Sequence, residues 1–169
     1  MKSAQGLKSV YADEMKDLWS ANDQMSKVVK VMSEKAHDPK LKLALEKSII
    51  AINKHADTLK SLLTVSGEKV EKEHCKGMEG LVKEASKHMT QEMKAGEILD
   101  IVIISQYQRM SHYGLAGFGT VAAYAKALGM KDHVTKLTHI VTNIYQGDAY
   151  ATKLAEKAEA AAAQDAKAA

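Results

Sequence analysis

The sequence predicts an all-α domain, an antiparallel four-helix bundle of two helical hairpins joined by a long crossover that contains a short helix. Three observations favour this class. The chain of 169 residues has one Pro and one Phe and is rich in helix-forming residues. Apolar residues recur at three- and four-residue steps through four long segments. Helix-breaking residues separate these segments where a hairpin requires a turn.

The first hairpin is predicted from two segments, 5–36 and 39–66. Each carries apolar residues on one helical face, and they share a break of two residues. Asp38 is placed to cap the second helix, and Pro39 occupies its first position, where a missing N–H costs nothing. Gly67 ends that helix. A turn this short makes the two helices antiparallel neighbours.

The second hairpin follows a long connection, residues 70–96, which includes a short amphipathic stretch. A third long helix is predicted over 97–128 and ends at Gly129. A fourth begins near Lys131. The order is therefore helix, turn, helix, long crossover, helix, turn, helix.

One domain, residues 1–158, is expected to form the bundle, and the Ala-rich tail 159–169 is expected to be disordered. The 24 basic and 21 acidic residues alternate along the chain and give a net charge of +3, which is typical of a solvated helical surface and argues against a nucleic-acid partner. No apolar run approaches the ~20 residues of a membrane span. A cytoplasmic protein is expected. Cys75, the single cysteine, is assigned no role.

Polar residues interrupt the apolar faces near the middle of each predicted helix. Counted from Asp38, Asn22 lies 16 residues before the turn and His55 lies 17 after it; counted from Met130, His112 and Asp148 each lie 18 residues away. At ~1.5 Å per residue, the members of each pair sit at almost one height.

This layer allows two interpretations. His55, His112 and Asp148 resemble the minimum ligand set for a single iron, manganese or zinc ion, with Asn22 and Gln108 orienting the ligands without binding the metal. Alternatively, the polar groups hydrogen-bond one another and no metal is needed.

Two stretches resemble the signature motifs of the bacterial YciE/YciF ferritin-like proteins, and the resemblance covers nearly the whole chain. It implies a ferritin-like bundle, commonly a homodimer, linked to bacterial stress responses and carrying a di-iron-type site in some members. The stretches are Cys75-Lys-Gly-Met-Glu-Gly-Leu81 with Glu84-Ala85, and Gln108-Arg-Met-Ser-His112-Tyr113 followed by Ala116-Gly-Phe-Gly119-Thr120.

The carboxylates of the family pattern carry over poorly. Asn22, Gly114 and Ile144 stand where the pattern has Glu, the Glu-x-x-His of the second helix becomes Ile52-Asn-Lys-His55, and Asp148 is kept. A di-iron site needs about four carboxylates to balance and bridge its two cations. The resemblance, corrected for these departures, therefore implies a degenerate di-iron site.

Three functions are expected in order. The first is a non-catalytic, dimeric, stress-associated bundle, in which Gly117 and Phe118 lie at the dimer seam. The second is a mononuclear metalloprotein whose activity, if it has one, is metal-dependent oxidation. The third is a helical module that binds another protein. Phosphate-binding glycine loops, dinucleotide fingerprints and nucleophile elbows are absent from the sequence.

Overall fold

The computed structural model describes residues 6–90 and 96–168 and confirms the predicted all-α class. Gln5, part of the crossover (91–95) and Ala169 lie outside the described residues. The helix boundaries agree with the predicted breaks to within a few residues. The helices are α1 (Leu7–Lys35), α2 (Pro39–Val65), α3 (Lys76–Thr90), α4 (Glu97–Ala127) and α5 (Lys131–Ala168).

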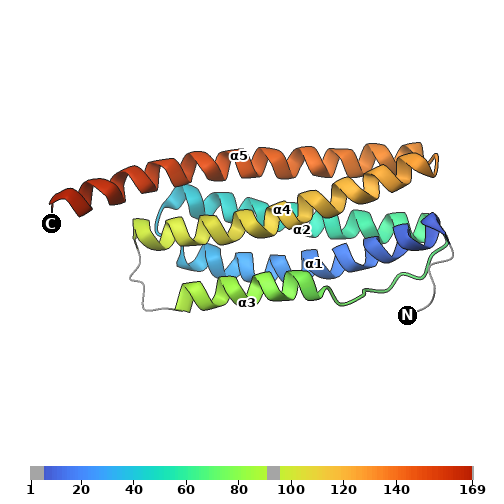
Figure 1. Ribbon diagram of the computed structural model, residues 1–169, viewed down its shortest axis with the longest axis horizontal. Coiled ribbons are helices and arrows are strands. Elements are labelled where there is room, and N and C mark those ends of the chain that lie inside the picture. Colours follow the sequence, from blue (N-terminus) through green and yellow to red (C-terminus); the bar gives the residue numbers. More distant parts are fainter. Residues whose placement is uncertain (1–5, 91–95, 169) are drawn as a thin grey trace.

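The four long helices form two antiparallel hairpins that lie side by side (Figure 1). In one hairpin α1 packs against α2, and in the other α4 packs against α5. The hairpins meet where α1 contacts α4 and where α2 contacts α5. The short helix α3 lies along α1 and α4, outside the four-helix arrangement. The crossover is therefore a fifth packing element.

The core divides into two clusters along the bundle. One includes Met15, Leu59 and Phe118, and the other includes Met32, Leu45 and Ile103, all with at most 2% of their surface exposed. The side chains come from all four long helices, with α3 contributing to the second cluster. Most apolar side chains on the predicted helix faces are thus covered by neighbouring helices.

The turn between α1 and α2 is held by two carboxylates. The side chain of Asp38 accepts a hydrogen bond from the backbone N–H of Lys40 at 2.7 Å, as predicted for an N-cap. Asp100 on α4 is 2% exposed and accepts from the N–H groups of His37 at 2.8 Å and Asp38 at 2.9 Å. Asp100 therefore joins the two hairpins at this end of the bundle.

Asp100→Asn is expected to lower the free energy of unfolding by about 1–2 kcal/mol, because the amide keeps one acceptor oxygen and loses the charge that strengthens both bonds. Urea denaturation followed by circular dichroism measures this difference. Asp165→Asn, at an exposed position of α5, is the matched control and should change stability by less than about 0.5 kcal/mol. Equal stability of the two variants would contradict the bridging role.

The expected disordered tail is helical instead, because α5 continues to Ala168. Residues 159–168 contain Ala, Gln, Glu, Lys and Asp and no Gly or Pro, so helix propensity sustains the helix once the packed part has nucleated it. In Figure 1 this end of α5 projects beyond the other helices.

Gly117 and Phe118 do not lie at an exposed seam. A Cβ atom at Gly117 would clash with the side chain of Leu18, so the missing side chain lets α1 approach α4 within one chain. Phe118 is 1% exposed in the single chain. The close approach at Gly117 is therefore between two helices of one chain, not at the predicted dimer seam.

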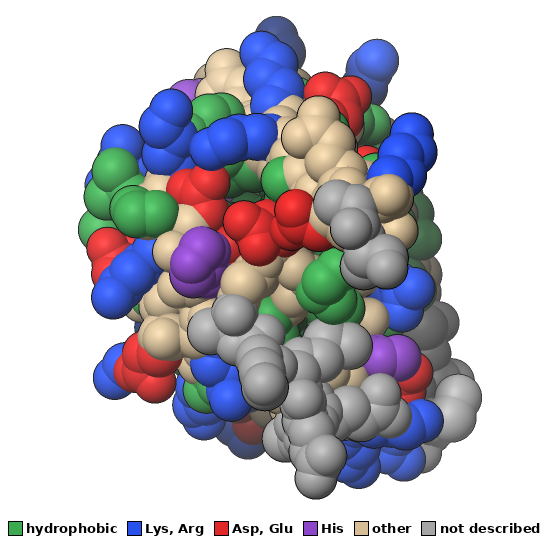
Figure 2. All heavy atoms as spheres, turned by 90° about the vertical axis from the view of Figure 1, so that its left-hand side faces the viewer, with side chains coloured by type: hydrophobic (Ala, Val, Ile, Leu, Met, Phe, Trp, Pro, Cys, Tyr) green, Lys and Arg blue, Asp and Glu red, His purple; other side chains and the backbone are tan. Residues whose placement is uncertain are grey.

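The surface carries charges of both signs. Figure 2 views the end of the bundle that contains the α1–α2 turn and shows Lys and Arg side chains with Asp and Glu among them. In the part of the chain that the structure describes, no helix combines the length and the apolar character that crossing a bilayer demands.

Candidate functional site

A half-open cavity of about 660 Å³ lies between α2, α4 and α5 and reaches α1 at its base. This volume is within the ~300–1,000 Å³ range of small-molecule sites. Its walls are mainly apolar and include Met25, Leu41, Leu45, Ile52, Ile144 and Leu154.

Asn22 and His55, the predicted pair of the first hairpin, both line this cavity. Asn22 is 7% exposed, and its Nδ2 has no hydrogen-bond partner among the described residues. A buried amide without a partner costs free energy. The self-satisfied polar layer that the sequence allowed is therefore not formed.

His55 is 6% exposed, and its ring stands edge-on to Phe118 with 5.8 Å between the ring centroids. Burial, with a smaller contribution from the charge of His139, lowers the pKa of His55 to about 4. The ring is neutral at pH 7 and presents one N–H donor and one acceptor nitrogen.

His112, Asp148 and Gln108 form a second group on α4 and α5. His112 Nε2 lies 3.1 Å from Asp148 Oδ2, and Gln108 Nε2 donates to Asp148 Oδ1 at 3.1 Å and to Thr152 Oγ1 at 2.9 Å. The His112 side chain is 59% exposed. The predicted level pairing of His112 with Asp148 is present, but this pair faces solvent.

The structure does not bring His55 together with this pair. Among the described residues, no group of three His, Cys, Asp or Glu side chains is placed to hold a metal ion. Ser111 lines the cavity, and one residue further along a helix turns the side chain by about 100°. His112 therefore lies outside the cavity that contains His55.

The cavity also does not fit a di-iron group. Its lining, as far as the structure describes the chain, takes its polar groups from Asn, His, Ser, Gln, Tyr and Lys and contains no Asp or Glu. Two iron cations in a buried site require carboxylates to balance their charge.

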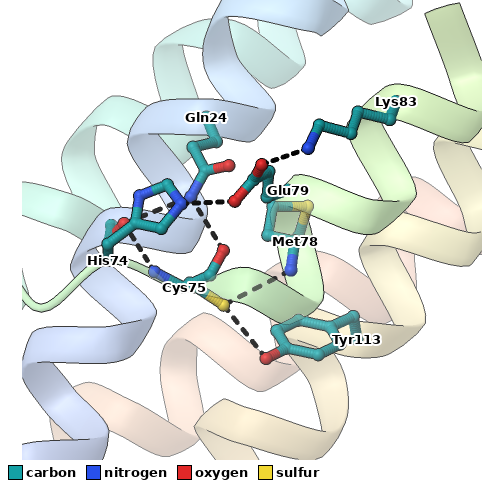
Figure 3. A network of polar contacts seen from close by, with 8 residues as sticks. Gln24, His74, Cys75, Met78, Glu79, Lys83 and Tyr113 are labelled. Carbon is teal, nitrogen blue, oxygen red and sulfur yellow. Dashed lines mark hydrogen bonds and ion pairs between the residues drawn. The ribbon is translucent and has the colours of Figure 1, made fainter.

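A third polar group lies where α3 begins, and sequence reasoning missed it. Cys75 is fully buried: its N–H donates to Ser20 Oγ at 3.0 Å and its carbonyl accepts from Gln24 Nε2 at 3.0 Å (Figure 3). Its Sγ lies 3.1 Å from the hydroxyl of Tyr113. The only available signal was the spacing of Ser20 and Gln24 one helical turn apart.

Burial raises the pKa of the Cys75 thiol and, for the same reason, that of the Tyr113 hydroxyl. A thiol with a raised pKa is a weak nucleophile at neutral pH. These contacts fix the start of α3 against α1 and α4. Nearby, Glu79 is bound by Lys83 and by His74, whose Nε2 lies 2.6 Å away, and these partners lower the Glu79 pKa to about 2.

A second hollow of about 650 Å³ continues from the first along the seam between α2 and α5. The two share Lys47, Ala51, His55 and Asn143. The second adds Lys54, Lys136 and His139 to its lining, and Asp57 is its one carboxylate among the described residues. The apolar periodicity could not predict this basic hollow, because its lysines and His139 lie beside the apolar helix faces and not on them.

The family model described as "Domain of unknown function (DUF892)" matches residues 6–166. Among individual proteins, the chain is 24% identical over 126 residues to Protein YciF of Escherichia coli (strain K12), covering 74% of this chain and 75% of that protein.

Two solved structures share the fold. The crystal structure of the E. coli stress protein YciF matches with a TM-score of 0.85 at 22% identity, over 91% of this chain and 97% of the other. YcfI of Rhodopseudomonas palustris, described as a candidate structural protein, matches with a TM-score of 0.84 at 24% identity, over 89% and 96%.

Proposed function

Because the chain belongs to the DUF892 family, together with the YciE/YciF proteins, we propose that it is a non-catalytic ferritin-like protein of the bacterial stress response with a degenerate metal centre. The description of the relative YciF as a stress protein supports the stress assignment. The proposal includes a cytoplasmic location and assembly as a homodimer.

One observation carries the non-catalytic assignment: the mid-bundle cavity is lined by no carboxylate among the described residues. Asn22 and His55 lie on its wall, and neither supplies negative charge. A bundle that oxidises metal ions binds them through inward-facing carboxylates. This cavity offers uncharged polar groups and the ammonium groups of Lys40 and Lys47 in their place.

The close approach of His112 to Asp148 favours a second candidate, a protein that binds one iron, manganese or zinc ion. This pair supplies two ligands of the three or four that such ions take from a protein. Gln108, which bonds to Asp148, would orient the carboxylate. His55 would have no part in this site.

Exposed apolar side chains favour a third candidate, a module that binds another protein. Leu43 and Ile50 on α2 and Tyr145 and Tyr150 on α5 are 45–59% exposed. Such residues are typical of contact surfaces when they form one patch.

Metal analysis of the purified chain, after incubation with ferrous iron, manganese or zinc and removal of free metal, tests the first candidate. Wild type, His55→Ala and His112→Ala are all expected to hold well below one equivalent per chain, because no described group of three ligands exists. One equivalent that is lost in His112→Ala and kept in His55→Ala would favour the mononuclear site. Two equivalents of iron with rapid ferrous oxidation would overturn the proposal.

A further inference from the structure

The seam between α2 and α5 contains one continuous cleft with two chemically different halves. The two hollows described above adjoin each other at four shared lining residues. The first half is apolar and lies within the bundle, with Leu45, Ile52 and Leu154 buried in its wall. A molecule that fills the whole cleft must therefore have an apolar part and a polar part.

Cationic groups line both halves of the cleft: Lys40 lies in the first half only, Lys47 lies in both, and the second half adds Lys54 and Lys136. Lys47 and Lys54 reach the second half from α2, and neither forms an ion pair with another described residue. Lys136 on α5 adds a further ammonium group that Asp132 partly neutralises at 2.7 Å. The one carboxylate of this half, on Asp57, contacts Lys60 at 2.9 Å. The local charge favours an anion.

Hydrogen-bonding capacity is available in the wall of the first half, at Asn22, and at the junction of the two halves, at His55. Asn22 Nδ2 is a buried donor without a partner in the wall of the apolar half. His55 lines both halves and brings a neutral ring with one further donor. An incoming acceptor oxygen would satisfy the amide and remove the cost of burying it unpaired.

We infer that this cleft binds a free medium-chain fatty acid such as dodecanoate. The hydrocarbon chain lies in the apolar half, and the carboxylate lies toward the junction, accepts from Asn22 Nδ2 and faces Lys47 and Lys54. An inorganic anion would leave the apolar half of the cleft unfilled, so the shape of the cleft favours the fatty acid over it. A neutral hydrocarbon would leave the Asn22 amide without an acceptor and the lysines without an anion, so the cleft favours the fatty acid over it.

Binding is measured by titration calorimetry of the full, delipidated chain with dodecanoate below its micelle concentration. One molecule per chain is expected. Octanoate and decanoate should bind more weakly, by about fourfold for each methylene removed, because each buried methylene contributes ~0.8 kcal/mol. The absence of saturable binding would overturn the inference.

Two variants test where the hydrocarbon chain lies. Ala51→Phe places a ring where the halves meet and should weaken dodecanoate binding more than tenfold. Ala123→Phe, the same change at an exposed position of α4 outside both hollows, should leave it unchanged. If both variants lost affinity for dodecanoate equally, or neither did, the ligand would bind outside this cleft and the inference would be overturned.

The head group is tested without adding bulk, so the result does not depend on how Ala51→Phe folds. Asn22→Leu should weaken dodecanoate about tenfold and dodecanol less, because both head groups accept from the amide but only the carboxylate forms a charge-assisted bond. Lys54→Gln should weaken dodecanoate several-fold, more so at low salt, and Lys42→Gln, on the same helix outside the cleft, should not. Equal affinity for acid and alcohol in the wild type would overturn the carboxylate assignment.

A second copy of the chain is the competing occupant. A dimer that weakens in Ala51→Phe by sedimentation analysis, combined with no dodecanoate binding, would assign the cleft to the partner and overturn the inference. The result is separable from that of the proposed function, because metal content and fatty-acid binding are measured independently on the same preparation.

Discussion

Phe118→Ala is expected to lower the free energy of unfolding by about 3–5 kcal/mol. Phe118 is 1% exposed and belongs to the cluster that contains Leu59 and Leu137. Truncation removes the apolar contacts of the ring and leaves a cavity that rigid helices cannot close. Urea denaturation at pH 7, followed by circular dichroism, gives the difference as a lower midpoint with a similar slope.

Two controls define the cause. Phe118→Leu keeps most of the volume and should cost less than half as much as Phe118→Ala. Tyr145→Ala removes an aromatic ring that is 59% exposed on α5 and should change stability by about 0.5 kcal/mol or less. Because Phe118 is buried within one chain, its effect should not depend on protein concentration. If the loss of unfolding free energy in Phe118→Ala disappeared in dilute solution, Phe118 would lie at a dimer interface.

The fold was predictable because a few residues end each helix and leave little choice of topology. Pro39 begins α2, and Gly67 and Gly129 follow the ends of α2 and α4 with positive φ values of 68° and 72°. Asp38 caps α2 by the predicted bond to a backbone N–H. These signals are local, so they can be read from neighbouring residues. Helix boundaries and hairpin order follow from them.

The tail was mispredicted for a related reason. Composition alone marks an Ala-rich end as disordered, but a packed helix that meets no breaker continues by propensity. Gly147 is the last glycine of the chain, and it lies well before the tail. The correct prediction required noting that no helix-breaking residue follows Asp148. Amphipathic periodicity does not show this.

The candidate site was predictable only within each hairpin. Counting from a turn gives height along the axis, and it correctly paired His112 with Asp148. Asn22 and His55 line the same cavity. Rotation about the axis is set by packing between hairpins, and it turned Ser111 toward the cavity in place of His112. Asp100 shows the same limit: its partners lie 62 and 63 residues away and could not be read from its neighbours.

The second large effect is a loss of stability on acidification, caused by His55. Its pKa in the folded chain is about 4, against 6.5 for an unburied histidine, mainly because burial disfavours the charged ring. As pH falls below about 6.5, the unfolded chain takes up the proton and the folded chain does not. The free energy of unfolding therefore decreases from pH 6.5 to about pH 4, by roughly 3 kcal/mol if the full difference of about 2.5 pH units contributes at 1.36 kcal/mol each.

Denaturation at several pH values between 7 and 4 measures this slope. His55→Gln should flatten it, because glutamine does not titrate, whereas His37→Gln, at an exposed position of the α1–α2 turn, should leave it as in the wild type. Part of the slope should survive in His55→Gln, since burial also lowers the pKa of His133. An unchanged slope in His55→Gln would mean that water or a bound molecule already stabilises the charged ring. Dodecanoate should then be tested first, because a carboxylate beside His55 would raise its pKa and flatten the wild-type slope in the same way.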